Sequence, residues 1–383
     1  MSTASTLNQI RTELNEQFYE RESAIDVMLL AVLSREHGFI IGPPGTGKSK
    51  LVREFAGRFV GATYFEQLLS KNRPDQAVLG PWDLPLLRDK GEFRRRDEGF
   101  LTTADIVFLD ELGKASPTLG HDLLAATNER VKHEVANGRS AQPIPLHTLL
   151  AASNEHPAGE SEDAAAMWDR LLLRVQVDYI SSDSNFIALM DQDPSAIGHT
   201  KVLFSEVQDA TKEVQEVAVS AATLDGLLTV RNALRDAGMQ VSDRRLRKSL
   251  SVVKANAWLA GRNQTQADDL GVLQHTLWED LEQIKKVQRL ILGVAAPVEQ
   301  EALELLDDAN EILANLKARK GEASDKLLGA ATEANGKATL LWQKADKLPP
   351  DSVTAKQVKV VVRDIRAVAL GYLGIPVDSV KEF

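Results

Sequence analysis

A phosphate-binding pattern occupies residues 42–49, which read GPPGTGKS. The spacing G-x-x-x-x-G-K-[S/T] lets successive backbone N–H groups face one anion, and the N-terminus of the following helix adds partial positive charge. We expect Lys48 to reach the outer phosphates of a nucleotide and the Ser49 hydroxyl to contact Mg²⁺. An apolar run before the pattern and helical spacing after it supply the strand–loop–helix context that this chemistry needs.

Two acids and an amide, each at the end of a later apolar run, extend this chemistry to ATP hydrolysis. Four apolar residues precede Asp110 and Glu111, which predicts a buried strand ending in two carboxylates. We expect Asp110 on the magnesium side and Glu111 as the group that activates the attacking water. Asn154 follows the next apolar run, where its amide can hold that water beside the γ-phosphate. A GTPase is disfavoured because no apolar strand ends in a guanine-recognition motif. A small-molecule kinase is disfavoured because it needs no hydrolytic base, the role expected of Glu111.

These side chains require a parallel sheet whose strands all end at one edge. Strand candidates are residues 38–42, 104–111, 147–154 and 171–180, with helical patterns between them and two helices before the first. Apolar strands that alternate with helices are typical of an α/β fold in which helices cover both faces of a parallel sheet.

Four parts follow from this organisation. We predict an α/β nucleotide-binding core over 1–182, a polar linker over 183–202, an all-α domain over 203–292 and a helical C-terminal extension over 293–383. Pro194 and Gly198 interrupt the linker. Apolar residues at helical spacing in the extension favour a helical hairpin or a small bundle.

Composition restricts the location and the partners of the protein. The 383-residue chain has a formal charge of -10 and no cysteine, which disfavours binding to nucleic acid or anionic lipid and fits a reducing cytoplasm. Its longest apolar stretch, 24–33, is too short to cross a membrane, and the N-terminus lacks a secretory pattern. The basic run 94–96 is flanked by acids, so we expect a solvated insertion tip or a pore-facing loop, with Trp82 and Phe93 packing nearby.

In this order, residues 42–49, VFLDE at 107–111 and AASN at 151–154 resemble an AAA+ ATPase. The stretches 19–49, 78–111, 123–157, 166–179 and 241–270 resemble the MoxR branch of that class, and RavA-type members of it in particular. The similarity extends from Leu14 to Ile284. It implies an AAA+ core followed by an all-α lid.

The resemblance also implies roles for further residues. Arg170 would project from one subunit onto the γ-phosphate of its neighbour, with Arg174 as the alternative. Arg244 would sense the nucleotide from the lid of the same subunit, although Arg245 and Arg247 leave that choice open. The implied nucleotide-binding set is Tyr19, Gly42, Pro43, Pro44, Gly45, Thr46, Gly47, Lys48, Ser49 and Lys50.

At the level of the molecule, the resemblance implies a homo-oligomeric, hexameric ring that uses ATP and Mg²⁺ to remodel or activate a protein substrate. A von Willebrand factor A (VWA) domain protein is the implied partner, with the extension as its docking element. Three alternatives remain: a nucleic-acid-stimulated motor of the helix-insert clade, a Rubisco-activase-like member, and a scaffold that uses ATP only to assemble.

Overall fold

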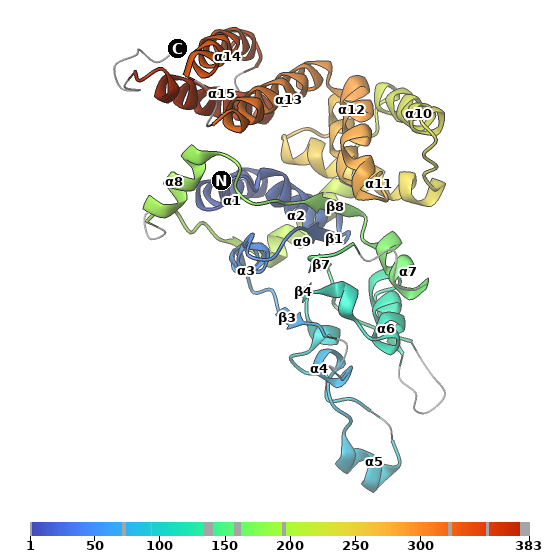
Figure 1. Ribbon diagram of the computed structural model, residues 1–383. Coiled ribbons are helices and arrows are strands. Elements are labelled where there is room, and N and C mark those ends of the chain that lie inside the picture. Colours follow the sequence, from blue (N-terminus) through green and yellow to red (C-terminus); the bar gives the residue numbers. More distant parts are fainter. Residues whose placement is uncertain are drawn as a thin grey trace. The chain divides into compact units, whose positions relative to one another are not determined.

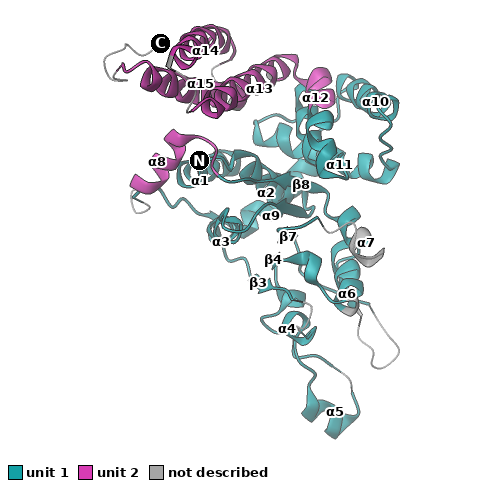
Figure 2. Ribbon diagram, viewed as in Figure 1, with its two compact units in different colours: residues 1–179, 193–288 teal, residues 180–192, 289–383 magenta. Residues whose placement is uncertain are grey.

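A computed structural model describes residues 2–70, 74–92, 94–133, 141–156, 162–193, 197–320, 324–349 and 352–375 (Figure 1). Two compact units share the chain: residues 1–179 with 193–288, and residues 180–192 with 289–383 (Figure 2). The first unit carries the sheet and the lid helices. The second carries the C-terminal helices together with one short helix from the middle of the chain.

The core of the first unit is a five-stranded parallel sheet with the order β3-β4-β7-β1-β8. This confirms the predicted α/β fold. The strands are β1 (Gly38–Ile41), β3 (Tyr64–Leu68), β4 (Ile106–Asp110), β7 (Thr148–Ser153) and β8 (Leu173–Gln176). Sequence reasoning missed β3, because it is an edge strand whose side chains are largely polar or exposed and so lacks an apolar run.

Helices cover the sheet through apolar side chains. They are α1 (Thr3–Gln17), α2 (Glu22–Ser34), α3 (Lys48–Ala56), α6 (Pro117–Asn128), α7 (Glu162–Arg170) and α9 (Phe204–Glu216). Helix α2 is buried without interruption from Val27 to Ser34, because it packs against α9, α11 (Asp243–Leu259) and β8. It therefore joins the sheet to the lid.

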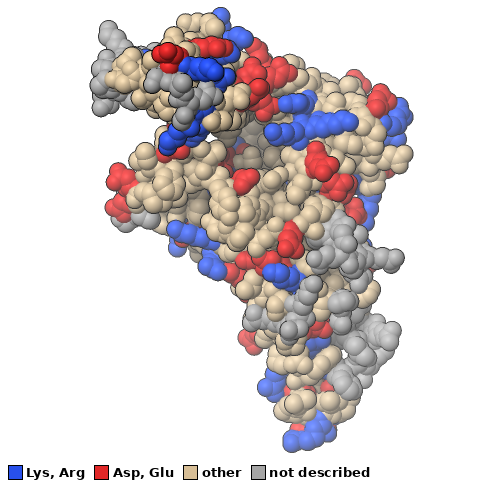
Figure 3. Space-filling view, viewed as in Figure 1, with Lys and Arg blue, Asp and Glu red and all other residues tan. Residues whose placement is uncertain are grey.

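An insertion between β3 and β4 holds the short helices α4 (Gln76–Leu79) and α5 (Leu84–Lys90). Basic side chains gather at its tip (Figure 3). Two members of the tri-arginine run are used within the insertion itself: the Arg95 guanidinium lies 4.2 Å from the Trp82 ring centroid, and Arg96 forms an ion pair with Asp83 at 3.2 Å. Phe93 lies outside the described residues. Part of the positive charge that nucleic-acid binding would need is therefore already engaged within the insertion.

The lid is formed by α10 (Ala221–Asp236), α11 and the 3₁₀ segment η4 (Ala267–His275), and the boundary between the two units falls within the next helix, α12 (Ile284–Ala295), after Gln288. Ser220 and Ser242 cap α10 and α11 by accepting backbone N–H bonds. Residues 183–202, predicted as a linker, contain helix α8 (Asp183–Asp191) and the first residue of the short strand β9 (Val202–Leu203). Ser182 caps α8, and an apolar run lies within the helix. These two features indicate a helix, but the polar residues around them made the segment resemble a linker.

The second unit is a bundle of three long helices with α8 beside it. The helices α13 (Pro297–Ala318), α14 (Ser324–Ala345) and α15 (Val353–Tyr372) share a core of alanine, leucine, valine and isoleucine side chains. Asp183 of α8 pairs with Lys317 of α13 at 2.8 Å. No helix within the described ranges is both long and apolar enough to span a bilayer.

Candidate nucleotide site

The loop 42–49 connects β1 to α3 at the carboxyl edge of the sheet. Gly42 is required by crowding, because a Cβ there would lie 2.1 Å from the Val177 carbonyl oxygen. Gly47 is required by conformation, because its φ of 81° lies in the left-handed region directly before the first residue of α3. The sequence thus folds the backbone around the start of a helix, as anion binding requires.

Lys48 is the cation of this loop and is only 7% exposed. Its Nζ donates to the carbonyl oxygens of Gly42 (2.7 Å) and Pro43 (2.9 Å) and to Asn154 Oδ1 (2.8 Å), which uses all three N–H bonds. Burial lowers the pKa of Lys48, and the nearby carboxylates of Asp110 and Glu111 oppose that shift. The ammonium group is therefore held at the mouth of the loop.

Ser49 and Asp110 meet beside it, since the Ser49 hydroxyl donates to Asp110 Oδ2 at 2.6 Å. Hydroxyl and carboxylate oxygens are the donors that Mg²⁺ prefers. Within the described ranges, no three His, Asp or Glu side chains gather closely enough to hold a metal on their own. The pair fits an ion that takes its remaining ligands from phosphate and water.

Glu111 lies one residue further on, in a backbone conformation that non-glycine residues seldom adopt, with φ 58° and ψ 47°. Its carboxylate accepts a hydrogen bond from the Asn154 amide and pairs with Lys114 at 3.3 Å. Asn154 therefore bridges Lys48 and Glu111 through its two amide atoms. The predicted set Lys48, Ser49, Asp110, Glu111 and Asn154 lies together at one edge of the sheet.

Two residues that the sequence did not reveal donate hydrogen bonds to backbone carbonyls of the loop. Arg21, which is 7% exposed, donates to the carbonyl oxygens of Thr46 (3.2 Å) and Asp178 (2.6 Å). The Tyr179 hydroxyl donates to the Pro44 carbonyl oxygen at 3.1 Å. Neither residue belongs to a periodic or motif-like pattern, so only the fold reveals them. The predicted Tyr19 is half-buried in the turn before Arg21, and Lys50 is exposed on α3 with its Nζ 5.9 Å from the Phe18 ring centroid.

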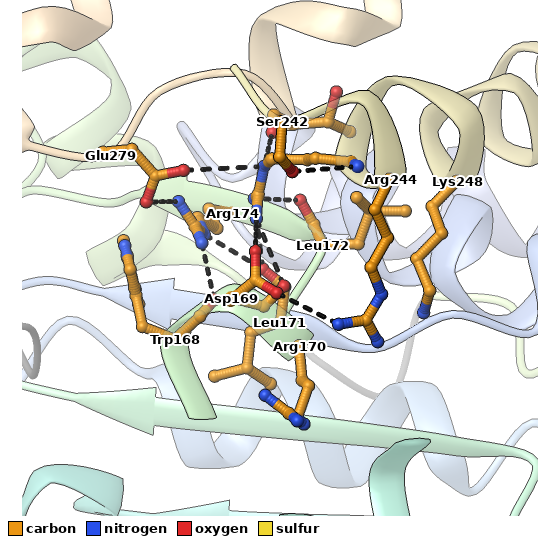
Figure 4. Close-up of polar contacts among 12 residues, drawn as sticks. Trp168, Asp169, Arg170, Leu171, Leu172, Arg174, Ser242, Arg244, Lys248 and Glu279 are labelled. Carbon is orange, nitrogen blue, oxygen red and sulfur yellow. Dashed lines mark hydrogen bonds and ion pairs between the residues drawn. The ribbon is translucent and has the colours of Figure 1, made fainter. Parts of the chain in front are cut away.

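The predicted arginines lie near the other end of the strands, where β1 and β8 begin. Leu173 pairs with Gly38, so β8 begins level with the start of β1, about 13 Å from Gly42 along the strand. Arg170 ends α7 just before this point; its Nη1 donates to the Ala166 carbonyl (2.7 Å), and its Nε has no hydrogen-bond partner in the described part of the chain. Figure 4 shows its guanidinium apart from the neighbouring ion pairs.

Arg174 does not fit the finger role. It is completely buried, with its guanidinium 3.8 Å from the Trp168 ring centroid and paired with Glu279 at 3.0 Å. Burial, with the neighbouring charge of Arg245, lowers the pKa of Arg174 to about 9. A side chain enclosed in this way is not placed to project onto another subunit, which disfavours Arg174 as the finger.

Arg244 also lies away from the nucleotide loop of its own chain. It donates to Asn128 and to Asp169 (3.4 Å), beside Arg170. Asn128 lies near the start of β1, because its neighbour Thr127 accepts a hydrogen bond from His37, which directly precedes that strand. Lys48 lies beyond the other end of β1. The same-subunit sensor role assigned to Arg244 therefore does not fit this structure. Arg245 is 2% exposed and Arg247 is exposed.

Comparisons with known proteins agree with this arrangement. The family described as "MoxR domain in the MoxR-vWA-beta-propeller ternary systems" matches residues 5–216, and an AAA lid domain family matches residues 222–291. Two uncharacterised proteins of Methanocaldococcus jannaschii are 34% and 35% identical over 311 and 310 residues, which cover 81% and 80% of this chain and 79% and 81% of those proteins. The crystal structure of a candidate ATPase from Cytophaga hutchinsonii aligns with a TM-score of 0.57 at 17% identity, over 76% of this chain and 93% of that one, which supports the fold.

Proposed function

Because the chain belongs to the MoxR family of AAA+ ATPases, we propose that it hydrolyses ATP in a ring of subunits to remodel or activate a target protein together with a VWA-domain partner. The observation that carries the hydrolytic part is the Asn154 bridge, which joins the phosphate-loop lysine to the carboxylate that would receive a proton.

The residues divide the work as follows. Lys48 binds the outer phosphates, and Asn154 and Glu111 orient a water molecule in line with the γ-phosphorus. As the water oxygen bonds to phosphorus and the bond to the ADP oxygen breaks, Glu111 takes the water proton, and the products are ADP and phosphate. Mg²⁺, held by Ser49 and Asp110, would neutralise charge on the phosphate oxygens.

A ring is supported by the position of the arginines. Arg170 and Arg244 lie at the sheet edge opposite their own loop, where they are suited to meet the nucleotide of a neighbouring subunit. We propose Arg170 as the finger that stabilises charge on the transferred phosphoryl group, with Arg244 beside it. Hydrolysis then depends on the subunit interface, so nucleotide state becomes relative motion of subunits.

The partner is proposed from the family. The matching family is described by systems that combine MoxR, vWA and β-propeller proteins, which supports a VWA-domain partner and a protein target. The formal charge of -10 and the internal use of Arg95 and Arg96 make the nucleic-acid alternative the weaker one.

ATP turnover of three variants tests the hydrolytic part. Lys48→Ala is expected to lose ATP binding, whereas Glu111→Gln is expected to bind ATP and lose turnover. Asn154→Ala is expected to bind ATP with turnover about 10² to 10³-fold lower, as for loss of one transition-state donor. Asn263→Ala, at an exposed lid position, is the matched control and should behave like the parent protein. Parent-like turnover of Lys48→Ala or Glu111→Gln would refute the proposal.

A further inference from the structure

The end of helix α7, which carries Arg170, is held by two buried guanidinium groups. Arg245 donates to the carbonyl oxygens of Asp169 (3.3 Å), Leu171 (3.4 Å) and Leu172 (3.0 Å). Arg174 donates to those of Trp168 (2.5 Å) and Leu171 (2.9 Å). The last carbonyls of a helix lack partners within it and carry the negative end of its dipole, so cations are well suited to cap them.

These two arginines reach α7 from different elements, one in the lid and one in the sheet. Arg245 comes from lid helix α11, and its Nε also donates to the lid carbonyl of Thr276. Arg174 comes from core strand β8, and its Nη1 also donates to the Trp278 carbonyl (2.5 Å) that follows η4. Each guanidinium therefore binds the lid and the end of α7 at the same time.

Lid movement and finger position are coupled by this arrangement. Both guanidiniums are nearly inaccessible to solvent, so a separation of lid from α7 would leave buried charge and carbonyl groups unpaired. A turning lid is therefore expected to carry the end of α7 with it. Arg170 lies between the capped carbonyls of Asp169 and Leu171, so it must follow.

We infer that Arg245 is a positioning residue, which transmits the orientation of the lid to Arg170 of the same subunit and so to the nucleotide of the neighbouring subunit. This inference rests on the proposed function. It assigns to a lid residue an effect on the site next door, while the subunit's own Lys48, Asp110 and Glu111 stay intact.

Arg245→Lys is the direct test, because lysine keeps the charge but cannot hold three carbonyls in a fixed plane. Its ATP affinity is expected to match that of the parent protein, with turnover about 100-fold lower, as for a misplaced catalytic group. Arg235→Lys, the same substitution at an exposed position of lid helix α10, is the matched control and should be parent-like. Parent-like turnover of Arg245→Lys, or a parallel loss of ATP binding, would overturn the inference.

Mixed rings separate a neighbour effect from simple damage. Glu111→Gln subunits cannot hydrolyse ATP but keep a correctly held Arg170, so mixing them with Arg245→Lys subunits should restore turnover at the Arg245→Lys sites. Failure to restore it, with the parent enzyme active and Lys48→Ala inactive, would refute this inference and leave the proposed function standing. Should Arg245→Lys not fold, Glu279→Gln replaces it, because this half-exposed carboxylate lies 3.8 Å from Arg245, and the same restoration is required.

Discussion

At the scale of single residues, local spacing identified side chains that the fold brings together around the loop 42–49, but it could not distinguish the two candidate finger arginines. Lys48 and Ser49 belong to one contiguous pattern, and the ends of parallel strands brought Asp110, Glu111 and Asn154 to them. Arg170 and Arg174 look equivalent in sequence. They differ in the structure because Trp278 and Glu279, about a hundred residues later in the chain, bind Arg174 and enclose it. Arg170 makes neither contact.

The two arginines should therefore respond oppositely to removal. Arg174→Ala leaves Glu279 and several carbonyls unpaired, so we expect the free energy of unfolding to fall by about 3 to 5 kcal/mol. Arg170→Ala should leave that free energy nearly unchanged while turnover falls by about 10³-fold or more. Urea unfolding and steady-state ATPase assays measure the two effects. Parent-like stability of Arg174→Ala, together with a strongly destabilised Arg170→Ala protein, would show that the assignment is reversed.

At the scale of elements, buried histidines fix the sheet to its helices. His37 Nδ1 accepts the Leu149 N–H (3.0 Å) while its Nε2 bonds the Thr127 carbonyl (2.8 Å), and His147 Nε2 bonds the Val32 carbonyl (2.8 Å). One ring nitrogen of His37 must stay unprotonated, because a backbone N–H can only donate. Hydrophobic periodicity predicted the central strands, but it could not show β3 or these connections, which depend on tertiary neighbours.

Stability should consequently fall in acid. Burial lowers the pKa of His37 to about 3 and that of His147 to about 4, below the unfolded value of about 6.5. The contribution of each is complete above pH 6.5 and is lost as the pH falls toward the folded pKa, because the unfolded chain then binds the proton. Between pH 6.5 and pH 5, protonation of each histidine in the unfolded chain should lower the free energy of unfolding by about 2 kcal/mol.

Urea unfolding at pH 7.5 and pH 5.0 measures this loss. At pH 5.0, His147→Gln should take up about one proton fewer on unfolding than the parent protein, because one titrating ring is gone. Equal proton uptake by the two proteins would show that His147 is not held neutral in the folded state.

At the scale of the whole molecule, every residue of the proposed site lies in the first unit, and the extension lies in the second. The fold class followed from the alternation of strands and helices. The division of the chain did not, since nothing in residues 180–192 indicates that α8 joins helices more than a hundred residues later.

Truncation after residue 297 is expected to leave basal ATP hydrolysis intact and to abolish binding of the VWA-domain partner. The measurement is recovery of that partner by ATP-trapped Glu111→Gln protein, with and without the extension. Undiminished recovery by the truncated protein would dismiss the extension as the docking element.

The placement of α8 bears on how such an extension arises. The polypeptide passes between the two units three times, after residues 179, 192 and 288. A bundle appended by gene fusion would need one junction only, whereas this one also relies on Asp183 from the interior of the chain. Relatives with a different C-terminal region should therefore differ at residues 180–192 as well, and the two segments should be inherited together.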